Sequence, residues 1–258
     1  MALGELYKPS GLAREQAQAV LEVEKPYAVN VAWGCSNKCL YCYGPLVGRQ
    51  SRETWKIVRH PKKDSVELVR KQLAKGIDPQ GVFISFETDP FLEENRQTTE
   101  PLIGLLLEQG IRVATSSKVG ASKHRGVRHG MTVVSLDEEF CTKWEPNAPS
   151  PELRIKELRK CHDRGDSTWF SLEPCPPPTI WEQDIKELLR AISFANLIIK
   201  GRWQYDKRAS SEEAKKAYVR IMGEVADFCK SRKIRLHIKS ETKEFLWGSH
   251  VSRVNIRT

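Results

Sequence analysis

Three cysteines stand close together in the stretch GCSNKCLYCY, which spans residues 34–43. Cys35, Cys39 and Cys42 follow a C-x3-C-x2-C spacing. Thiolates at such short spacing are typical ligands of zinc or of iron–sulfur clusters. A closed site of either kind needs four ligands, so the triple leaves one coordination position to be filled. The sequence therefore predicts a metal centre whose fourth ligand lies elsewhere in the chain or comes from another molecule.

Two kinds of metal centre are compatible with the triple. The first is a structural zinc site that takes Cys175 or a histidine as its fourth ligand. Structural zinc sites usually pair their cysteines as two C-x2-4-C units, and no second local pair occurs here. The second is a [4Fe–4S] cluster in which three irons bind thiolates and the fourth iron stays open. We favour the cluster, because soft thiolate triples suit iron–sulfur chemistry.

The elements that must position this loop alternate along the chain. Short β-branched runs alternate with longer helical ones, which favours a parallel sheet covered by helices on both faces. The strand-like runs are 27–33, 81–86, 111–116, 131–136, 167–172, 196–200 and 234–239. The pattern predicts an α/β fold, a single-domain partial (β/α) barrel with about six parallel strands. We expect an N-terminal extension over 1–26, the barrel over 27–240 and a C-terminal tail over 241–258.

Polar residues follow the predicted strands. In a parallel barrel the carboxyl ends of the strands meet at one mouth, where catalytic groups are found. Cys35 follows the first strand, so we expect the cysteine loop at this mouth. The later strands lead into Glu87, Thr88, Asp89, Ser116, Ser117, Lys118, Ser135, Asp137, Glu173, Cys175, Lys200, Arg202 and Trp203.

Composition narrows the cellular setting and the partners. The 258 residues carry a formal charge of +9, which favours a polyanionic partner, nucleic acid first. No run of about 18 apolar residues suggests a membrane span, and the N-terminus lacks a signal-peptide pattern. We therefore expect a cytoplasmic protein without a membrane partner. Seven cysteines, an odd number, fit reduced ligands and core residues better than a disulfide framework.

The cysteine motif, with Tyr41 before its last cysteine, resembles that of the radical S-adenosylmethionine superfamily. Three further stretches are similar to the spore photoproduct lyase-like branch, whose members are often labelled DNA repair photolyases. They are YKPSGLARE (7–15), TDPF (88–91) and SLDEEFCTKWEPNAPSPELRIKEL (135–158). The last contains the EP-x-A-P-S-P-x-x-R run of that branch, here from Glu145 to Arg154.

The resemblance implies a particular chemistry. The open iron would be chelated by the amino and carboxylate groups of S-adenosylmethionine, which answers the question of the missing ligand. A one-electron donor of the flavodoxin or ferredoxin type reduces the cluster. Cleavage of the sulfonium then yields a 5′-deoxyadenosyl radical that abstracts a hydrogen atom from the substrate. The protein binds and orients these groups and excludes solvent from the radical.

The resemblance also suggests roles for individual residues. Glu87 or Thr88 would meet the amino group of the cofactor, Lys118 its carboxylate, and Ser135 its amino group or ribose. Tyr41 and Tyr43 resemble paired tyrosines of the family, one stacking near the cofactor and one relaying a hydrogen atom. Each of these residues could instead end its strand at solvent or pack the loop.

Cys175, in LEPCPPPT, is expected to point at the mouth as a candidate radical or hydrogen-donor residue. This chain also lacks a cysteine that is typical of the branch. True spore photoproduct lyases carry a hydrogen-donating cysteine near the end of the second strand, where this chain reads ISFETDP. Repair of the spore lesion by that route is therefore not expected.

A basic segment with aromatic residues, GRWQYDKR, follows the sixth predicted strand. Arg202, Trp203, Tyr205 and Lys207 have the composition that grips a phosphate backbone and stacks bases, and a solvated loop is the alternative. Three functions follow: a radical enzyme acting on nucleic acid, one acting on a peptide, protein or small metabolite, and a zinc-stabilised nucleic-acid-binding protein without catalysis.

Overall fold

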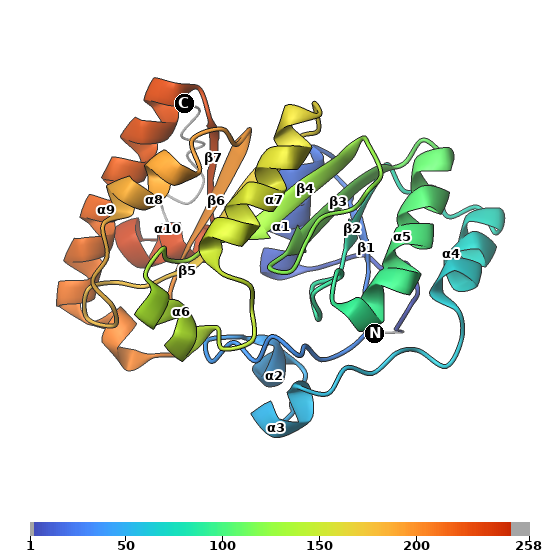
Figure 1. The fold of residues 1–258 in the computed structure, drawn as a ribbon, viewed down its shortest axis with the longest axis horizontal. Coiled ribbons are helices and arrows are strands. Elements are labelled where there is room, and N and C mark those ends of the chain that lie inside the picture. The colour runs from blue at the N-terminus through green and yellow to red at the C-terminus, as the bar shows by residue number, and fades with distance from the viewer. Residues whose placement is uncertain (1–2, 249–258) are drawn as a thin grey trace.

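Seven parallel strands form the centre of the computed structural model, which describes residues 3–248 (Figure 1). Each strand pairs with the next one along the chain, and within the described residues β1 and β7 do not pair, so the barrel is open. The predicted partial barrel is confirmed. The strands are β1 Tyr27–Val29, β2 Gly81–Ile84, β3 Arg112–Ser117, β4 Val127–Thr132, β5 Thr168–Cys175, β6 Leu197–Arg202 and β7 Arg235–Ile238.

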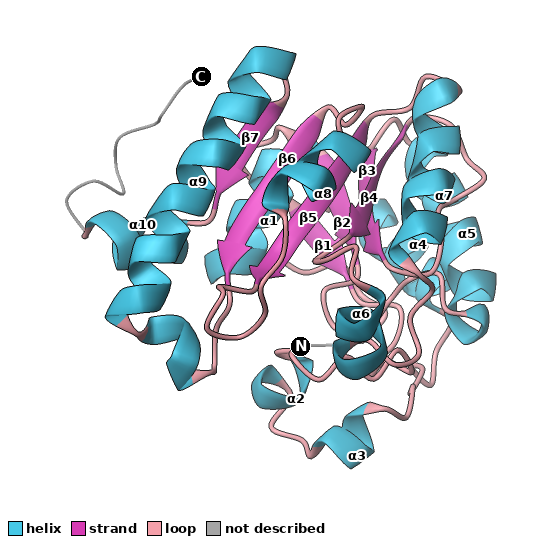
Figure 2. Ribbon diagram, turned by 60° about the vertical axis from the view of Figure 1, so that its left-hand side comes forward, coloured by secondary structure: helices cyan, strands magenta, loops and turns pink. Residues whose placement is uncertain are grey.

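Helices cover the convex face of the sheet and surround its mouth. On the convex face lie α4 Ser65–Ala74, α5 Glu93–Glu108, α7 Pro151–Asp163, α8 Ile185–Ala191, α9 Glu212–Arg232 and α10 Ser240–Trp247. Below the carboxyl ends of the strands lie the short elements α2 Gly44–Val47, α3 Arg52–Trp55, α6 Glu138–Trp144 and η1 Lys207–Ser210 (Figures 1 and 2). No described helix is long and apolar enough to cross a membrane. Of the predicted tail, residues 249–258 lie outside the described residues.

The N-terminal extension contributes a helix to the inside of the barrel. Helix α1 (Gly11–Leu21) buries Ala17, Val20 and Leu21 against concave-face residues such as Phe83 and Trp169. Its first turn faces the mouth, and its last turn lies at the amino-terminal edge of the sheet, where Gly81 leaves room for Leu21. A helix therefore occupies the lumen of the barrel on the amino-terminal side of the site.

Strand β4 differs from the prediction, which placed it at 131–136. Pairing with β3 and β5 sets it at Val127–Thr132, with His129 opposite Thr168. After Val127 the strand contains Arg128 and His129, whose side chains have specific partners, so its amino-terminal half lacks the apolar pattern of a buried strand. Its carboxyl end is therefore Thr132, and Ser135 lies three residues beyond it.

Candidate cofactor site at the mouth of the barrel

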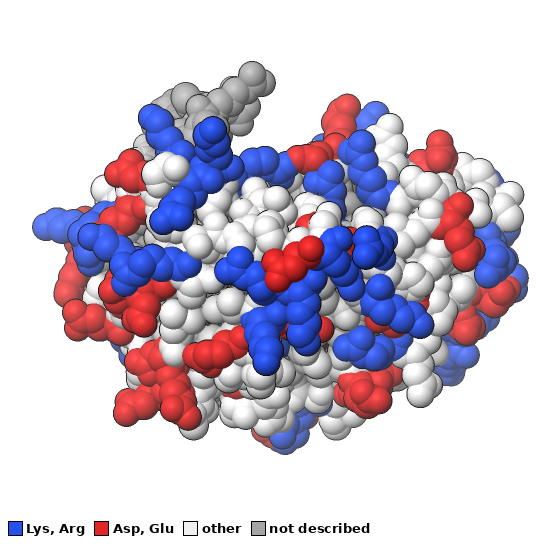
Figure 3. Space-filling model, turned by 45° about the horizontal axis from the view of Figure 1, so that its top comes forward, with Lys and Arg blue, Asp and Glu red and all other residues white. Residues whose placement is uncertain are grey.

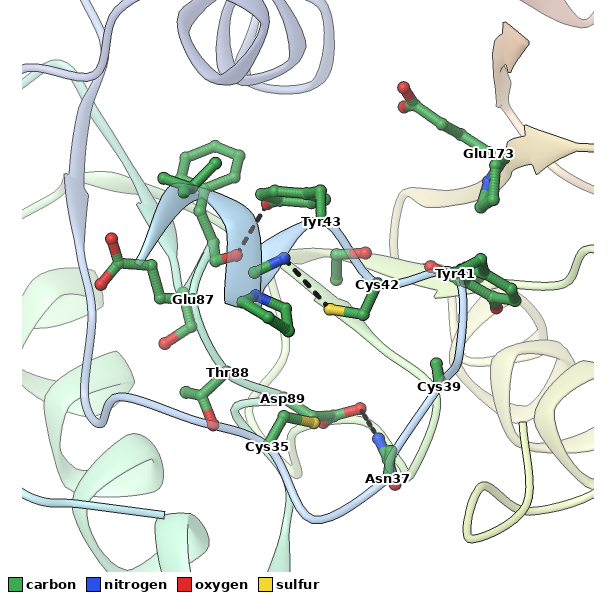
Figure 4. A pocket seen from close by; sticks show the side chains of 18 of the residues that line it. Cys35, Asn37, Cys39, Tyr41, Cys42, Tyr43, Glu87, Thr88, Asp89 and Glu173 are labelled. Carbon is green, nitrogen blue, oxygen red and sulfur yellow. Dashed lines mark hydrogen bonds between the residues drawn. The ribbon is translucent and has the colours of Figure 1, made fainter. Parts of the chain in front are cut away.

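A cavity of about 740 Å³ opens at the carboxyl ends of the strands (Figure 4). Its walls are the cysteine loop, the ends of β2, β3, β5 and β6, and the first turn of α1. This volume is in the range of pockets that bind cofactors and drug-sized ligands. The predicted convergence of strand-end groups on one mouth is therefore present, although not with every residue that the sequence suggested.

The three cysteines of the loop line this cavity as free thiols. Cys35 is held by its backbone N–H, which donates to Trp55 O (2.8 Å), and the Cys42 sulfur accepts from Gly44 N (3.4 Å). Burial raises the pKa of Cys35 to about 12, with a further contribution from the charge of Asp89. Burial also raises the pKa of Cys39 to about 11. These thiolates are thus unfavourable unless a cationic centre compensates them.

The three thiols are not arranged as ligands of a single metal ion. Ligands of one tetrahedral zinc lie within about 4 Å of one another, given Zn–S bonds near 2.3 Å. Among the described residues, the three sulfurs do not form a group whose members all lie within 4.8 Å of one another. The described lining of the cavity also includes neither Cys175 nor a histidine, so the expected fourth zinc ligand is not present there.

A segment after α6 fastens the cysteine loop from the other side. We call residues 144–148 the strap. Trp144 O accepts from Leu40 N (2.9 Å), Asn147 N donates to Asn37 O (3.3 Å), and Asn147 Nδ2 donates to Ser36 O (2.8 Å). Because these bonds fall on both sides of Cys39, the strap holds this part of the loop in place.

A buried charged network completes the strap. Tyr41 OH donates to Glu145 Oε1, and Glu145 Oε2 lies 2.5 Å from Arg154 Nη2, with both charged side chains almost fully buried. Arg154 also donates to Pro149 O (2.7 Å) and Thr132 O (3.1 Å). Burial and the adjacent Glu145 hold the pKa of Tyr41 well above its ordinary value, so its phenol remains protonated. The EPNAPSP run is therefore part of the site.

Asp89 joins the cysteine loop to the ends of β2 and β3. Its carboxylate accepts from Ser117 Oγ (2.6 Å), Lys118 N (2.7 Å) and Asn37 Nδ2 (3.2 Å), the last drawn in Figure 4. A fourth bond comes from Phe91 N (3.0 Å). The sequence placed Asp89 at a strand end but gave no reason to single it out, because its partners come from three separate segments.

Two carboxylates lie at the cavity without such a network. Glu87, three residues beyond the end of β2, lines the cavity, and burial raises its pKa. Glu173 on β5 lines the cavity as well, and its Oε2 lies 3.6 Å from Lys239 Nζ. Figure 4 shows the two carboxylates on opposite sides of the cysteine loop. Glu173 is a site residue that the sequence did not select, although its place at a strand end was a signal for it.

Five predicted cofactor or catalytic residues do line the cavity: Tyr41, Tyr43, Glu87, Thr88 and Lys118. Thr88 Oγ1 accepts from Asn95 Nδ2 (3.0 Å), and Tyr43 OH donates to Phe86 O (2.8 Å). Lys118 Nζ lies 5.4 Å from the ring centre of Tyr41, in cation–π contact. The structure thus brings these side chains together around the cysteines.

Two predicted site residues lie elsewhere. Ser135 is buried beyond the end of β4, where its hydroxyl accepts from Asp137 N (3.1 Å). Cys175 is buried in the convex-side core and borders a separate cavity of about 370 Å³. Ser171 and Glu173 face the mouth with the period of two that a strand imposes, but a register shift between Leu172 and Cys175 breaks it. The expectation that Cys175 points at the mouth is therefore wrong.

The four residues predicted to bind nucleic acid lie in different environments. Trp203 is 2% exposed and packs edge-to-face against Tyr41 (5.3 Å) and Trp144 (4.9 Å), so the prediction that it stacks bases is wrong. Arg202 Nε donates to Glu241 Oε2 (3.1 Å), which neutralises its charge. Tyr205 is 69% exposed at the cavity edge. Lys207 is exposed in η1.

Comparison with known proteins establishes the fold. No family model matches this chain. An uncharacterized protein, ORF301, of the Acidianus two-tailed virus is 26% identical over 206 residues, or 72% of this chain and 68% of the viral protein. Spore photoproduct lyase complexed with dinucleoside spore photoproduct superposes with a TM-score of 0.58 at 14% identity, over 83% of this chain and 76% of that one. Streptococcus suis SuiB bound to precursor peptide SuiA gives 0.58 at 12% identity, over 88% of this chain and 52% of SuiB.

Proposed function

We propose that this chain, which has the fold of the radical S-adenosylmethionine enzymes, is itself one of them. The observation that carries the proposal is the set of three free thiols on a loop at the barrel mouth, facing a cavity large enough for a cofactor. Structures of the two similar folds support it, since one of spore photoproduct lyase has bound AdoMet and one of SuiB is bound to S-adenosylmethionine.

The residues at the cavity would hold the two groups as follows. Cys35, Cys39 and Cys42 would bind a [4Fe–4S] cluster, and Glu87 would accept a hydrogen bond from the cationic amino group of S-adenosylmethionine. Lys118 would offer a cation to its carboxylate. Once reduced by a donor of the flavodoxin or ferredoxin type, the cluster and the bound S-adenosylmethionine would supply a radical that abstracts a hydrogen atom from a substrate.

The task of the chain itself is to bind and orient the cluster and the cofactor and to exclude water from them. The strap and Asp89 hold the cysteine loop, α1 closes the lumen from below, and the protonated Tyr41 stays linked to Glu145. Buried dipoles and charges that need no rearrangement are effective in such a water-poor site. A reducing compartment such as the cytoplasm suits the seven free cysteines.

The proposal is tested on protein purified without oxygen. We expect about four irons per chain, absorbance near ~400 nm and release of 5′-deoxyadenosine when dithionite and S-adenosylmethionine are added. Cys35→Ala, Cys39→Ala and Cys42→Ala should each lose all three properties. The matched control is Cys229→Ala, a buried cysteine in the convex-side core, which should retain them. Wild-type iron content in a variant lacking all three loop cysteines would contradict the proposal.

For the substrate we propose nucleic acid first. The charge of +9 and the exposed Tyr205 at the cavity edge support it, and spore photoproduct lyase has been captured with a dinucleoside lesion. A base must leave its stack to reach a radical in a cavity, and an aromatic side chain at the mouth would hold it. A peptide is the second candidate, because SuiB has been captured with a precursor peptide.

A further inference from the structure

One surface segment carries most of the net charge of the protein. We call residues 34–63 the flap; it comprises the cysteine loop, α2, α3 and the chain that leads towards α4. It contains one acidic residue, Glu53, and seven basic ones: Lys38, Arg49, Arg52, Lys56, Arg59, Lys62 and Lys63. Its net charge is therefore +6, out of +9 for the whole chain. Such a field attracts an acidic partner and speeds its association.

The flap also carries most of the large hydrophobic side chains that are exposed. Eight large hydrophobic side chains of the described residues are exposed, and five of them belong to the flap: Leu40, Tyr43, Leu46, Val47 and Ile57. Exposed apolar side chains in a segment that also carries polar and basic ones are typical of a protein–protein interface. Leu40, Tyr43 and Val47 also line the cavity, whereas Leu46 and Ile57 lie outside its lining and face away from it.

The flap is a well-packed segment that includes the three cysteines. Helices α2 and α3 pack beside each other below the mouth (Figures 1 and 2), with Trp55 so close to Gly44 and Gly48 that neither has room for a side chain. Leu40, between two of the cysteines, is 45% exposed while its N–H is held by the strap. A partner seated on Leu40 would therefore be next to Cys39 and two residues from Cys42.

We propose that the flap is the docking surface for a small acidic protein that carries single electrons. This inference rests on the proposed function, since it assigns the partner that reduces the cluster. In the step, the carrier is oxidised by one electron and the cluster is reduced by one, with no bond formed or broken. Electron transfer weakens steeply with distance, so the docking face must be the one nearest the cysteines.

The side chains of the flap favour a protein over nucleic acid. Single-stranded nucleic acids are held by aromatic platforms on which bases stack. Four of the five exposed apolar residues here are aliphatic, and the hydroxyl of the one aromatic, Tyr43, is bonded to Phe86 O. Aliphatic side chains bury well against a protein surface, and the surrounding cations would meet its carboxylates.

The experiment measures how fast reduced flavodoxin, an acidic one-electron carrier, bleaches the cluster absorbance of the anaerobic protein in stopped flow. One variant reverses two charges outside the cavity lining, Arg49→Glu with Arg59→Glu, and a second is Leu46→Ser with Ile57→Ser. The matched control, Lys216→Glu with Lys230→Glu, makes the same charge change on exposed residues of α9. Dithionite serves as a reductant too small to need docking.

We expect the second-order rate constant with flavodoxin to fall about tenfold at low salt in the charge-reversal variant, and the difference to shrink as salt rises. The apolar variant should be slowed at every salt concentration, whereas the control should match the wild type. Dithionite should reduce all four proteins equally, and a wild type that holds no reducible cluster would overturn the proposed function as well. Unchanged rate constants with flavodoxin in both flap variants would overturn the docking surface and leave the proposed function standing.

Discussion

Two glycines shape the cavity at positions where a side chain would collide with a site element. Gly34, just before the first cysteine, has φ +90°, and a Cβ there would lie 2.4 Å from Ile57 O. On β6, a Cβ at Gly201 would lie 2.6 Å from the Glu173 carboxylate. The first glycine permits the turn into the cysteine loop, and the second makes room for a carboxylate at the mouth. Neither role is visible without the neighbouring segment.

A cluster of three buried side chains near the amino-terminal edge of the sheet has the residue types of a metal site, but its charges are paired within the chain. The ligand atoms of His129, Cys161 and Asp166 lie within 4.8 Å of one another. Arg164 already supplies the cation: its guanidinium bonds Asp166 and lies 2.9 Å from His129 Nε2. Burial lowers the pKa of His129 to about 4, with Arg164 acting in the same direction and Asp166 opposing it.

This histidine predicts a pH dependence of stability. The folded pKa of about 4 lies below the ordinary 6.5, so between these values the unfolded chain binds more protons. Stability should be full above pH 6.5 and fall as the pH drops towards 4, by about 2 kcal/mol between pH 6.5 and pH 5. Urea unfolding of the wild type and His129→Gln under anaerobic conditions at several pH values measures this. An equal acid loss in both proteins would contradict it.

At the scale of elements, the strap fixes the position of the cysteine loop through hydrogen bonds. Its contacts come from the connection between α6 and α7, more than 100 residues after the cysteines. The buried Glu145 accepts a hydrogen bond from Tyr41 and forms an ion pair with Arg154. It therefore links the cysteine loop to the first turn of α7. Buried ion pairs are sensitive to loss of one partner, because the other charge is left without compensation.

Glu145→Gln should therefore destabilise the protein and its site together. The Arg154 guanidinium would stay buried without its counter-charge, at a cost of about 3 kcal/mol of unfolding free energy. Iron retained after desalting should also drop, since the strap no longer holds Tyr41. The control is Glu139→Gln, an exposed residue of α6. A variant as stable as this control, with full iron content, would show that the ion pair does not support the loop.

At the scale of the whole molecule, the basic residues have different tasks on different faces. Figure 3 shows Lys and Arg side chains around acidic ones on the face at the amino-terminal edge of the sheet. There Arg112, Arg128 and Arg235 donate to backbone carbonyls at the end of α1, and the last two also pair with Glu22. These arginines stabilise the carboxyl end of the lumen helix. A high total charge is therefore not by itself a measure of nucleic-acid binding.

Nucleic-acid binding should depend on the cavity edge. We expect Tyr205→Ala to weaken the binding of single-stranded RNA or DNA by about 1–3 kcal/mol, and Lys207→Ala to reduce the salt slope by about one unit. Trp203→Ala should instead destabilise the fold, because that ring is buried. Lys216→Ala on α9 is the control, and affinity is measured across a salt series. Undetectable or salt-insensitive binding of the wild type would favour the peptide substrate.

The sequence by itself determined the cysteine triple, the alternation of strands and helices, and the meeting of strand ends at one mouth. These features are local: they depend on spacing, periodicity and chain order. They were enough to place Cys35, Tyr41 and Glu87 at the cavity, and the resemblance in the EPNAPSP run indicated a segment that does contact the site.

Tertiary structure decided which side chains at those strand ends face the cavity. Pairing with its neighbours, rather than composition, set the end of β4 and left Ser135 outside, and one register shift on β5 turned Cys175 to the convex side. Trp203 went to the interior because aromatic neighbours from two other segments offered it more burial than the rim. Strand faces alternate residue by residue, so a shift of one position reverses a side chain, and only the packed sheet specifies that position.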